Sequence, residues 1–152
     1  MKGYNQIFGA DYLDTFALVA WLDTIRLLLV VAAQKDWRVY QLNVMYLLKW
    51  LLEEEIYVEQ PEGFVKKGEE YKVYLLKKAL YGLKQAPRAW YSRINEHLLN
   101  LGFAKSLSES TLYVKHNGAG ILIISLYVDD LLVTGNQTSL VEKFKLEMME
   151  FF

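Results

Sequence analysis

The sequence predicts an α+β fold in which an antiparallel sheet is backed by helices. Two observations support this class. Strand-like and helix-like segments interleave along the chain, and a short turn at residues 116–118 joins two strand candidates as in a β-hairpin. The chain has 152 residues, of which 53% are hydrophobic, so it can bury a core and is not a disordered segment.

Three segments have the composition and spacing of helices. Residues 16–33 are rich in Ala, Leu, Ile and Val and contain neither Gly nor Pro. Residues 87–101 begin at Pro87, which the first helical turn tolerates, and end before Gly102, which favours a helix end. Residues 139–152 carry apolar side chains at helical spacing, so we expect this last helix to pack on the sheet.

Six short segments are typical of strands. Residues 121–127 are continuously apolar, so we expect this strand inside a sheet. Residues 66–70 are charged and predict a hairpin tip that faces solvent. The strand candidates are residues 37–45, 56–59 and 73–76, the segment that ends before residue 116, and residues 121–127 and 131–134.

Charge and composition narrow the class of protein. The 17 Lys and Arg residues nearly balance 18 Asp and Glu residues, so the basic excess that usually marks nucleic-acid binding is absent. The absence of Cys excludes disulfides and thiolate metal sites. The apolar stretches are shorter than the roughly 18–20 residues that span a bilayer, and no signal peptide is recognisable. We therefore expect a soluble, intracellular protein without membrane contact; the sequence predicts neither its compartment nor its oligomeric state.

Residues 127–130, Tyr-Val-Asp-Asp, are the most informative short motif. Asp129 and Asp130 follow one apolar strand and precede another, so their carboxylates are expected at a turn between hydrophobic strands. Uncompensated carboxylates in such a place are costly, and hard oxygen ligands suit Mg²⁺ or Mn²⁺. For these four residues taken alone, an Asp-Asp turn that simply faces water is the favoured interpretation.

Three further blocks, taken with residues 127–130, resemble the reverse transcriptases of copia-type LTR retrotransposons. Residues 75–91 read Leu-Leu-Lys-Lys-Ala-Leu-Tyr-Gly-Leu-Lys-Gln-Ala-Pro-Arg-Ala-Trp-Tyr. Residues 56–64 read Ile-Tyr-Val-Glu-Gln-Pro-Glu-Gly-Phe, and residues 23–26 read Asp-Thr-Ile-Arg. The blocks follow the order of that family over nearly the whole chain. A lone Tyr-Val-Asp-Asp is a weak signal, whereas four ordered blocks are a specific one.

The resemblance implies a single partial domain built on a polymerase palm-like antiparallel sheet. Residues 37–152 would form the palm-like core and residues 1–36 a residual part of the fingers. The chain starts after the family's basic fingers strand and stops before the thumb and ribonuclease H regions. We therefore expect a truncated polymerase in which the thumb is absent.

The resemblance also implies the chemistry and the residues that carry it. The family's activity is template-directed nucleotidyl transfer with an RNA or DNA template-primer and a deoxynucleoside triphosphate, and two Mg²⁺ or Mn²⁺ ions clamp the reacting oxygens. For Gly82 and Pro87 a strand-to-helix turn without substrate contact is an equally good interpretation. The implied catalytic and metal-binding residues are Asp129 and Asp130, and the implied nucleotide- and template-binding residues are Tyr81, Gly82, Lys84, Gln85 and Arg88.

One departure from the family concerns its first catalytic carboxylate. The family reads Gln-Leu-Asp-Val where this chain has Gln-Leu-Asn-Val at residues 41–44, so Asn43 stands at the position of that Asp. The loss of one charge should weaken the metal pair by several kcal/mol, or about a thousand-fold or more in rate. The acids at residues 53–55 match acids that the family already has, so they do not replace it.

A second departure suggests how this segment arose. Residues 47–50, Leu-Leu-Lys-Trp, can be encoded CTT CTT AAA TGG. Read one nucleotide later, the same letters give Phe-Leu-Asn-Gly, which is the family's sequence at this place. We hypothesise two compensating frameshifts around residues 45–51; a coding sequence whose codons cannot be shifted to Phe-Leu-Asn-Gly contradicts the idea.

Three functional hypotheses follow. The favoured one is a degenerate reverse-transcriptase remnant that we expect to be inactive, a pseudoenzyme. The second is an active fragment of a Pol polyprotein that tolerates Asn43. The third is a non-enzymatic protein that binds nucleic acid or metal. Primer extension distinguishes the second from the others, and the salt dependence of nucleic-acid binding distinguishes the third.

Overall fold

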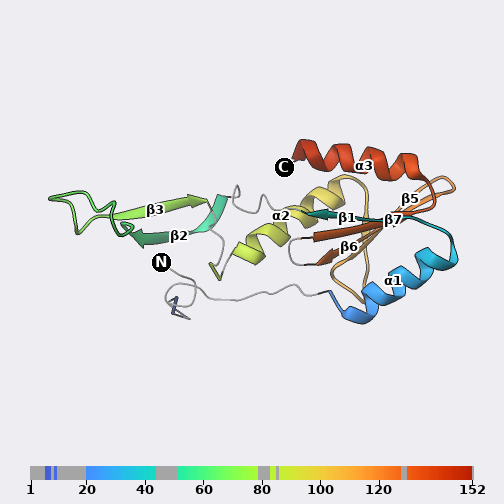
Figure 1. Ribbon diagram of the computed structural model, residues 1–152, viewed down its shortest axis with the longest axis horizontal. Coiled ribbons are helices and arrows are strands. Elements are labelled where there is room, and N and C mark those ends of the chain that lie inside the picture. Colours follow the sequence, from blue (N-terminus) through green and yellow to red (C-terminus); the bar gives the residue numbers. More distant parts are fainter. Residues whose placement is uncertain are drawn as a thin grey trace. The chain divides into compact units, whose positions relative to one another are not determined.

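A computed structural model describes residues 6, 7, 9, 20–43, 51–78, 83, 84, 86–127 and 130–151, with only the backbone for residues 51–54 and 78. The chain divides into two compact units, drawn in Figure 1. One unit joins residues 1–16 to residues 47–91, and the other joins residues 17–46 to residues 92–152. One of the boundaries, between residues 91 and 92, falls within a helix.

The second unit is built on a five-stranded sheet in which every neighbouring pair is antiparallel. The strands lie in the order β1-β7-β6-β5-β4. In the view of Figure 1 they run between helix α3 at the top and helix α1 at the bottom. The strands are β1 (Val39–Asn43), β4 (Ala104–Lys105), β5 (Leu112–Asn117), β6 (Gly120–Tyr127) and β7 (Asp130–Gly135).

Three helices accompany the strands, so the predicted mixed fold with an antiparallel sheet and helices is confirmed. They are α1 (Leu22–Gln34), α2 (Ala86–Asn100) and α3 (Thr138–Phe151). Helix α2 ends as the sequence predicts: Gly102 has φ +84°, a conformation that glycine adopts at little cost. The N–H of Gly102 and the N–H of Phe103 then close the last turn by donating to the carbonyl oxygens of Leu99 and Leu98.

The apolar core of this unit lies on one face of the sheet, and the fully buried Ser125 and Thr134 lie on the other. Because successive residues of a strand point to opposite faces, alternate residues of β6 and β7 face the helices together. Helix α3 packs on these two strands, and Phe144 meets Phe103 edge to face with ring centroids 5.5 Å apart. The fully buried side chains include Ile124 and Leu126 of β6, Leu131 and Val133 of β7, Tyr113 of β5, Leu98 of α2, and Val141 and Phe144 of α3.

One detail differs from the sequence-based expectation. His116 and Asn117 belong to strand β5, so the turn of this hairpin is shorter than predicted and centres on Gly118, whose φ is +58°.

His97 of α2 stacks on Phe151 of α3 with ring centroids 3.6 Å apart. Burial lowers the pKa of His97; Glu147 opposes that shift and Arg93 adds to it.

Helix α1 begins at Leu22, later than the predicted residue 16. Ala20 and Trp21 are described and are not helical, whereas residues 16–19 lie outside the described part of the chain. The Trp21 side chain provides no cap. Instead the Glu109 carboxylate accepts hydrogen bonds from the Trp21 N–H at 3.4 Å and the Thr24 hydroxyl at 3.3 Å. A carboxylate from the turn before β5 therefore caps the helix, where negative charge is favoured.

Glu109 is buried and is held from both sides. Its second oxygen accepts the Thr111 hydroxyl at 2.7 Å and the Thr111 N–H at 3.1 Å. Burial raises the pKa of Glu109, but the hydrogen bonds from Thr111, Trp21 and Thr24 together outweigh burial and leave the pKa below its usual value. The ionised carboxylate thus joins α1 to the β4–β5 connection.

We predict that Glu109→Gln lowers the free energy of unfolding by about 1–2 kcal/mol at pH 7, because one oxygen becomes an N–H group that faces donors. The folded pKa of Glu109 is lowered, so its contribution is present above the unfolded pKa and is lost as pH falls through the folded value. Urea unfolding at pH 7 and pH 3 measures both effects. Glu150→Gln, at an exposed position on α3, is the control; an equal loss in that variant contradicts the role of Glu109.

The first unit contains a two-stranded antiparallel hairpin of β2 (Leu51–Glu59) and β3 (Val73–Lys78). Ile56 and Val58 point to one face and form a small core with Leu83. Tyr57 and its cross-strand partner Leu75 lie on the other face and are exposed. The alternation explains why residues 56–59 and 73–76 are recognisable as strands in the sequence.

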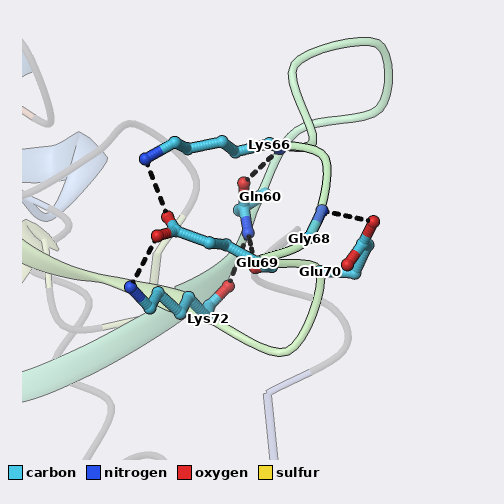
Figure 2. A network of polar contacts seen from close by, with 6 residues as sticks. All are labelled: Gln60, Lys66, Gly68, Glu69, Glu70 and Lys72. Carbon is cyan, nitrogen blue, oxygen red and sulfur yellow. Dashed lines mark hydrogen bonds and ion pairs between the residues drawn. The ribbon is translucent and has the colours of Figure 1, made fainter.

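The long connection between these strands is organised by Gln60 (Figure 2). Its amide nitrogen donates to the carbonyl oxygens of Glu69 at 2.6 Å and Lys72 at 3.0 Å, and its amide oxygen accepts the Lys66 N–H at 2.8 Å. Beside it, the Glu69 carboxylate lies between Lys72 at 2.9 Å and Lys66 at 3.1 Å and pairs with both, and these contacts lower the pKa of Glu69. The predicted charged hairpin tip at residues 66–70 is confirmed.

We predict that Gln60→Met leaves the global fold intact and speeds amide hydrogen exchange at Lys66 and along the tip by about three- to tenfold. The substitution keeps the side-chain length and removes three hydrogen bonds to the backbone of the loop. Hydrogen exchange followed by NMR measures the effect. Gln34→Met, at an exposed residue of α1, controls for the loss of an amide; unchanged exchange at Lys66 in Gln60→Met contradicts the role of Gln60.

No helix among the described residues is both long and apolar enough to cross a lipid bilayer.

Candidate functional site

Strand β1 lies beside β7, and this pairing brings two distant parts of the sequence together. The register places Asn43 directly opposite Asp130 and Gln41 opposite Leu132. Residues paired in this way point to the same face of an antiparallel sheet. Gln41, Asn43 and Asp130 therefore share one face, close to the end of β6, where Tyr127 also pairs with Asp130.

Both amide side chains donate hydrogen bonds to the Asp130 carboxylate. The Asn43 amide nitrogen lies 3.0 Å from Oδ1 of Asp130, and the Gln41 amide nitrogen lies 3.0 Å from Oδ2. Each carboxylate oxygen thus receives one N–H from a neutral side chain. The amide oxygens of Gln41 and Asn43 would repel the same carboxylate, so charge fixes which end of each amide faces Asp130. We call these three residues the amide–carboxylate cluster.

Comparison with known proteins adds to this geometry. The whole chain, residues 1–152, matches the family described as reverse transcriptase (RNA-dependent DNA polymerase). The chain belongs to this family. It is 46% identical over 142 residues to the retrovirus-related Pol polyprotein from transposon RE2 of Arabidopsis thaliana, and 45% identical over 140 residues to that from transposon RE1 of the same plant. Over the whole length of this chain, the identity to the retrovirus-related Pol polyprotein from transposon TNT 1-94 of Nicotiana tabacum is 40%.

The matches cover nearly all of this chain and little of the relatives. The aligned part is 93% of the chain but 10% of the RE2 polyprotein, and 100% of the chain but 12% of the TNT 1-94 polyprotein. No solved structure matches the chain. The prediction of a reverse-transcriptase segment of a copia-type Pol polyprotein is confirmed.

The described residues of the cluster do not fit a pair of divalent ions. Reverse transcriptases of this family generally use divalent metal ions, and such a pair needs several anionic oxygens to offset the repulsion between the ions. Here Asp130 supplies one carboxylate, and both neighbours present N–H groups, which are not ligands. Within the described part of the chain, no group of three or more His, Cys, Asp or Glu side chains is placed to hold a metal. Asp129 lies outside the described residues.

The other residues implied by the reverse-transcriptase motifs are only partly placed. Lys84 and Arg88 belong to the first compact unit, and both side chains are exposed. The Lys84 N–H donates to the Gln6 side-chain oxygen at 2.8 Å. Tyr81, Gly82 and Gln85 lie outside the described residues. The nucleotide- and template-binding roles of all five residues stay predictions.

Sequence reasoning singled out Asn43 and Asp130 but missed Gln41. A signal was present: Gln41 lies two residues before Asn43 in a segment expected to be a strand, so the two side chains had to share a face. The sequence did not reveal the register of β1 against β7, and the register alone decides that both amides reach Asp130.

We predict that Asn43→Asp lowers the free energy of unfolding by about 1–2 kcal/mol in buffer that contains a chelator. Two carboxylates would then lie opposite each other in neighbouring strands, and the hydrogen bond to Asp130 would be lost.

Urea unfolding in chelator measures this change. Asn117→Asp introduces the same charge on the same sheet, at the hairpin end of β5, and is expected to have a smaller effect. A loss in Asn117→Asp as large as that in Asn43→Asp would contradict a specific interaction of residue 43 with Asp130.

Proposed function

We propose that this chain is a palm-like reverse-transcriptase segment whose own metal-dependent nucleotidyl transfer is lost because Asn43 replaces a metal-binding carboxylate. The hydrogen bond from the Asn43 amide to Asp130 at 3.0 Å carries the proposal. The chain spans about a tenth of the length of the Pol polyproteins that it matches, so the proposal concerns this segment and not a complete polyprotein.

The proposal rests on charge. In the family's reaction two divalent ions hold the attacking and leaving oxygens, and template-primer and deoxynucleoside triphosphate are the substrates. An Asp at position 43 would lie opposite Asp130 and add a second negative charge on the same face of the sheet. Asn43 instead brings a neutral N–H donor to Oδ1, which satisfies the carboxylate without a cation.

The arrangement of the larger unit supports the palm-like assignment. The apolar core of its antiparallel sheet lies on the face where α3 packs, and Gln41 and Asn43 are exposed on the other face. Exposed amide side chains beside an acidic residue, Asp130, at the start of β7 suit a polymerase palm. In this proposal residues 37–152 form the palm-like core and residues 1–36 are the remaining part of the fingers. Asp129 and Asp130 are the two catalytic carboxylates that remain.

The first test is metal affinity. We expect the unaltered chain to bind Mn²⁺ weakly and at one site at most, as measured by electron paramagnetic resonance of the unbound ion. Asn43→Asp should tighten binding at least about tenfold, because a second carboxylate joins Asp130. Asn117→Asp, the matched control, should leave the affinity unchanged. Tight binding of two Mn²⁺ ions by the unaltered chain would contradict the proposed loss of metal-dependent activity.

The second test is primer extension by the same purified chain with Mg²⁺ or Mn²⁺. We expect no template-dependent incorporation of nucleotides, since the loss of one charge at the metal pair corresponds to a thousand-fold or greater loss of rate. Incorporation that disappears in Asp129→Ala would show that Asn43 is tolerated, contrary to the proposal.

A further inference from the structure

We infer that Gln41 is a positioning residue that fixes the orientation of the Asp130 carboxylate, whichever residue stands at position 43. The inference deepens the proposed function, since it concerns the same cluster and rests on Asp130 belonging to that site. It assigns to Gln41 a task that neither its sequence motif nor the comparisons suggest.

The two carboxylate oxygens of Asp130 accept hydrogen bonds from different side chains. Asn43 lies directly across the strand pair and meets Oδ1, whereas Gln41 approaches diagonally from the position opposite Leu132 and meets Oδ2. The extra methylene of Gln over Asn supplies the reach for this diagonal contact. Gln41 thus holds the oxygen that residue 43 does not use.

This division makes Gln41 compatible with either residue at position 43. With Asn43 the carboxylate is held at both oxygens, 3.0 Å from each donor. With Asp at position 43 the contact to Oδ1 is lost, and the Gln41 N–H still holds Oδ2. Oδ1 is then turned toward the new carboxylate, so the two oxygens that could share a cation face each other.

The inference has an energetic reason as well. A half-buried Asp with a single hydrogen bond can rotate about its last torsion, because that torsion has a broad minimum. A donor at Oδ2 restricts this rotation before any ion arrives, so less freedom is lost on binding. Gln41 is itself exposed, so its contribution to the stability of the fold is expected to be small.

The experiment compares Asn43→Asp with the double variant Asn43→Asp/Gln41→Met. Met keeps the length of the side chain and removes the amide donor. We expect the double variant to bind Mn²⁺ about three- to tenfold more weakly than Asn43→Asp, as for the loss of one hydrogen bond at an exposed position. Gln34→Met in the same background is the control and should not change the affinity.

A second readout needs no metal. In the unaltered background, Gln41→Met should shift the NMR signal of the Asp130 side-chain carboxyl carbon, while backbone amide signals of β5 and β6 stay in place and report an intact fold. Gln34→Met should leave the carboxyl signal unchanged. An unchanged carboxyl signal in Gln41→Met overturns the inference. Where Asn43→Asp has gained affinity for Mn²⁺, equal affinity in the single and double variants also overturns it.

The experiments distinguish an error in the proposed function from an error in the positioning role of Gln41. If Asn43→Asp gains no affinity for Mn²⁺, the proposed function is wrong, and the carboxyl carbon signal still decides whether Gln41 orients Asp130. If Asn43→Asp gains affinity and Gln41→Met changes neither readout, Gln41 has no positioning role and the proposed function stands.

Discussion

The pairing of β1 with β7 is the constraint on which the candidate site depends. It brings residues 87 and 89 positions apart in the sequence into hydrogen-bond contact, and it sets which side chains share a face. In an antiparallel pair a shift of one residue would turn every side chain of β1 to the opposite face. The register is held because β7 packs buried apolar residues under α3 on the other face. The core therefore fixes the geometry of the polar cluster.

Asp130 illustrates how a carboxylate is accommodated without a cation. The two amides give one N–H to each oxygen, and no net charge is added. A carboxylate at position 43 would need a cation for the same purpose. The proposed change from Asp to Asn would be small in volume and would leave the strand able to pair. In the proposed function a reverse-transcriptase fold therefore persists while its charge balance changes.

A second carboxylate, that of Glu109, also makes hydrogen bonds to residues far away in the sequence, and these bonds stabilise the fold. Glu109 holds the start of α1 from 85 and 88 positions away, and it is buried among hydroxyl and backbone donors. Gln60 plays a comparable part locally, since it joins three backbone groups of the long β2–β3 connection through its side chain. In both places one polar side chain forms hydrogen bonds with backbone groups of a connecting segment or a helix start.

The sequence by itself determined the class of fold and the family, and it predicted a departure from the family at residue 43. Helix α2, the second half of β2 and strands β3, β6 and β7 were recognisable because their signals are local: apolar periodicity, Pro87 near a helix start and Gly102 after a helix end. The start of α1 was placed too early because its cap comes from Glu109, which no local pattern reveals. The two-residue strand β4 was missed because it is too short to show alternation.

Only the tertiary structure decided which polar groups meet. Asn43 was notable from sequence motifs, but its partner, and the participation of Gln41, follow from the strand register. Register depends on how the whole sheet packs against its helices, and hydrogen bonds between residues so far apart leave no periodic trace in the chain. Local sequence patterns therefore determine where helices and strands form, and packing of the core determines which of their side chains meet.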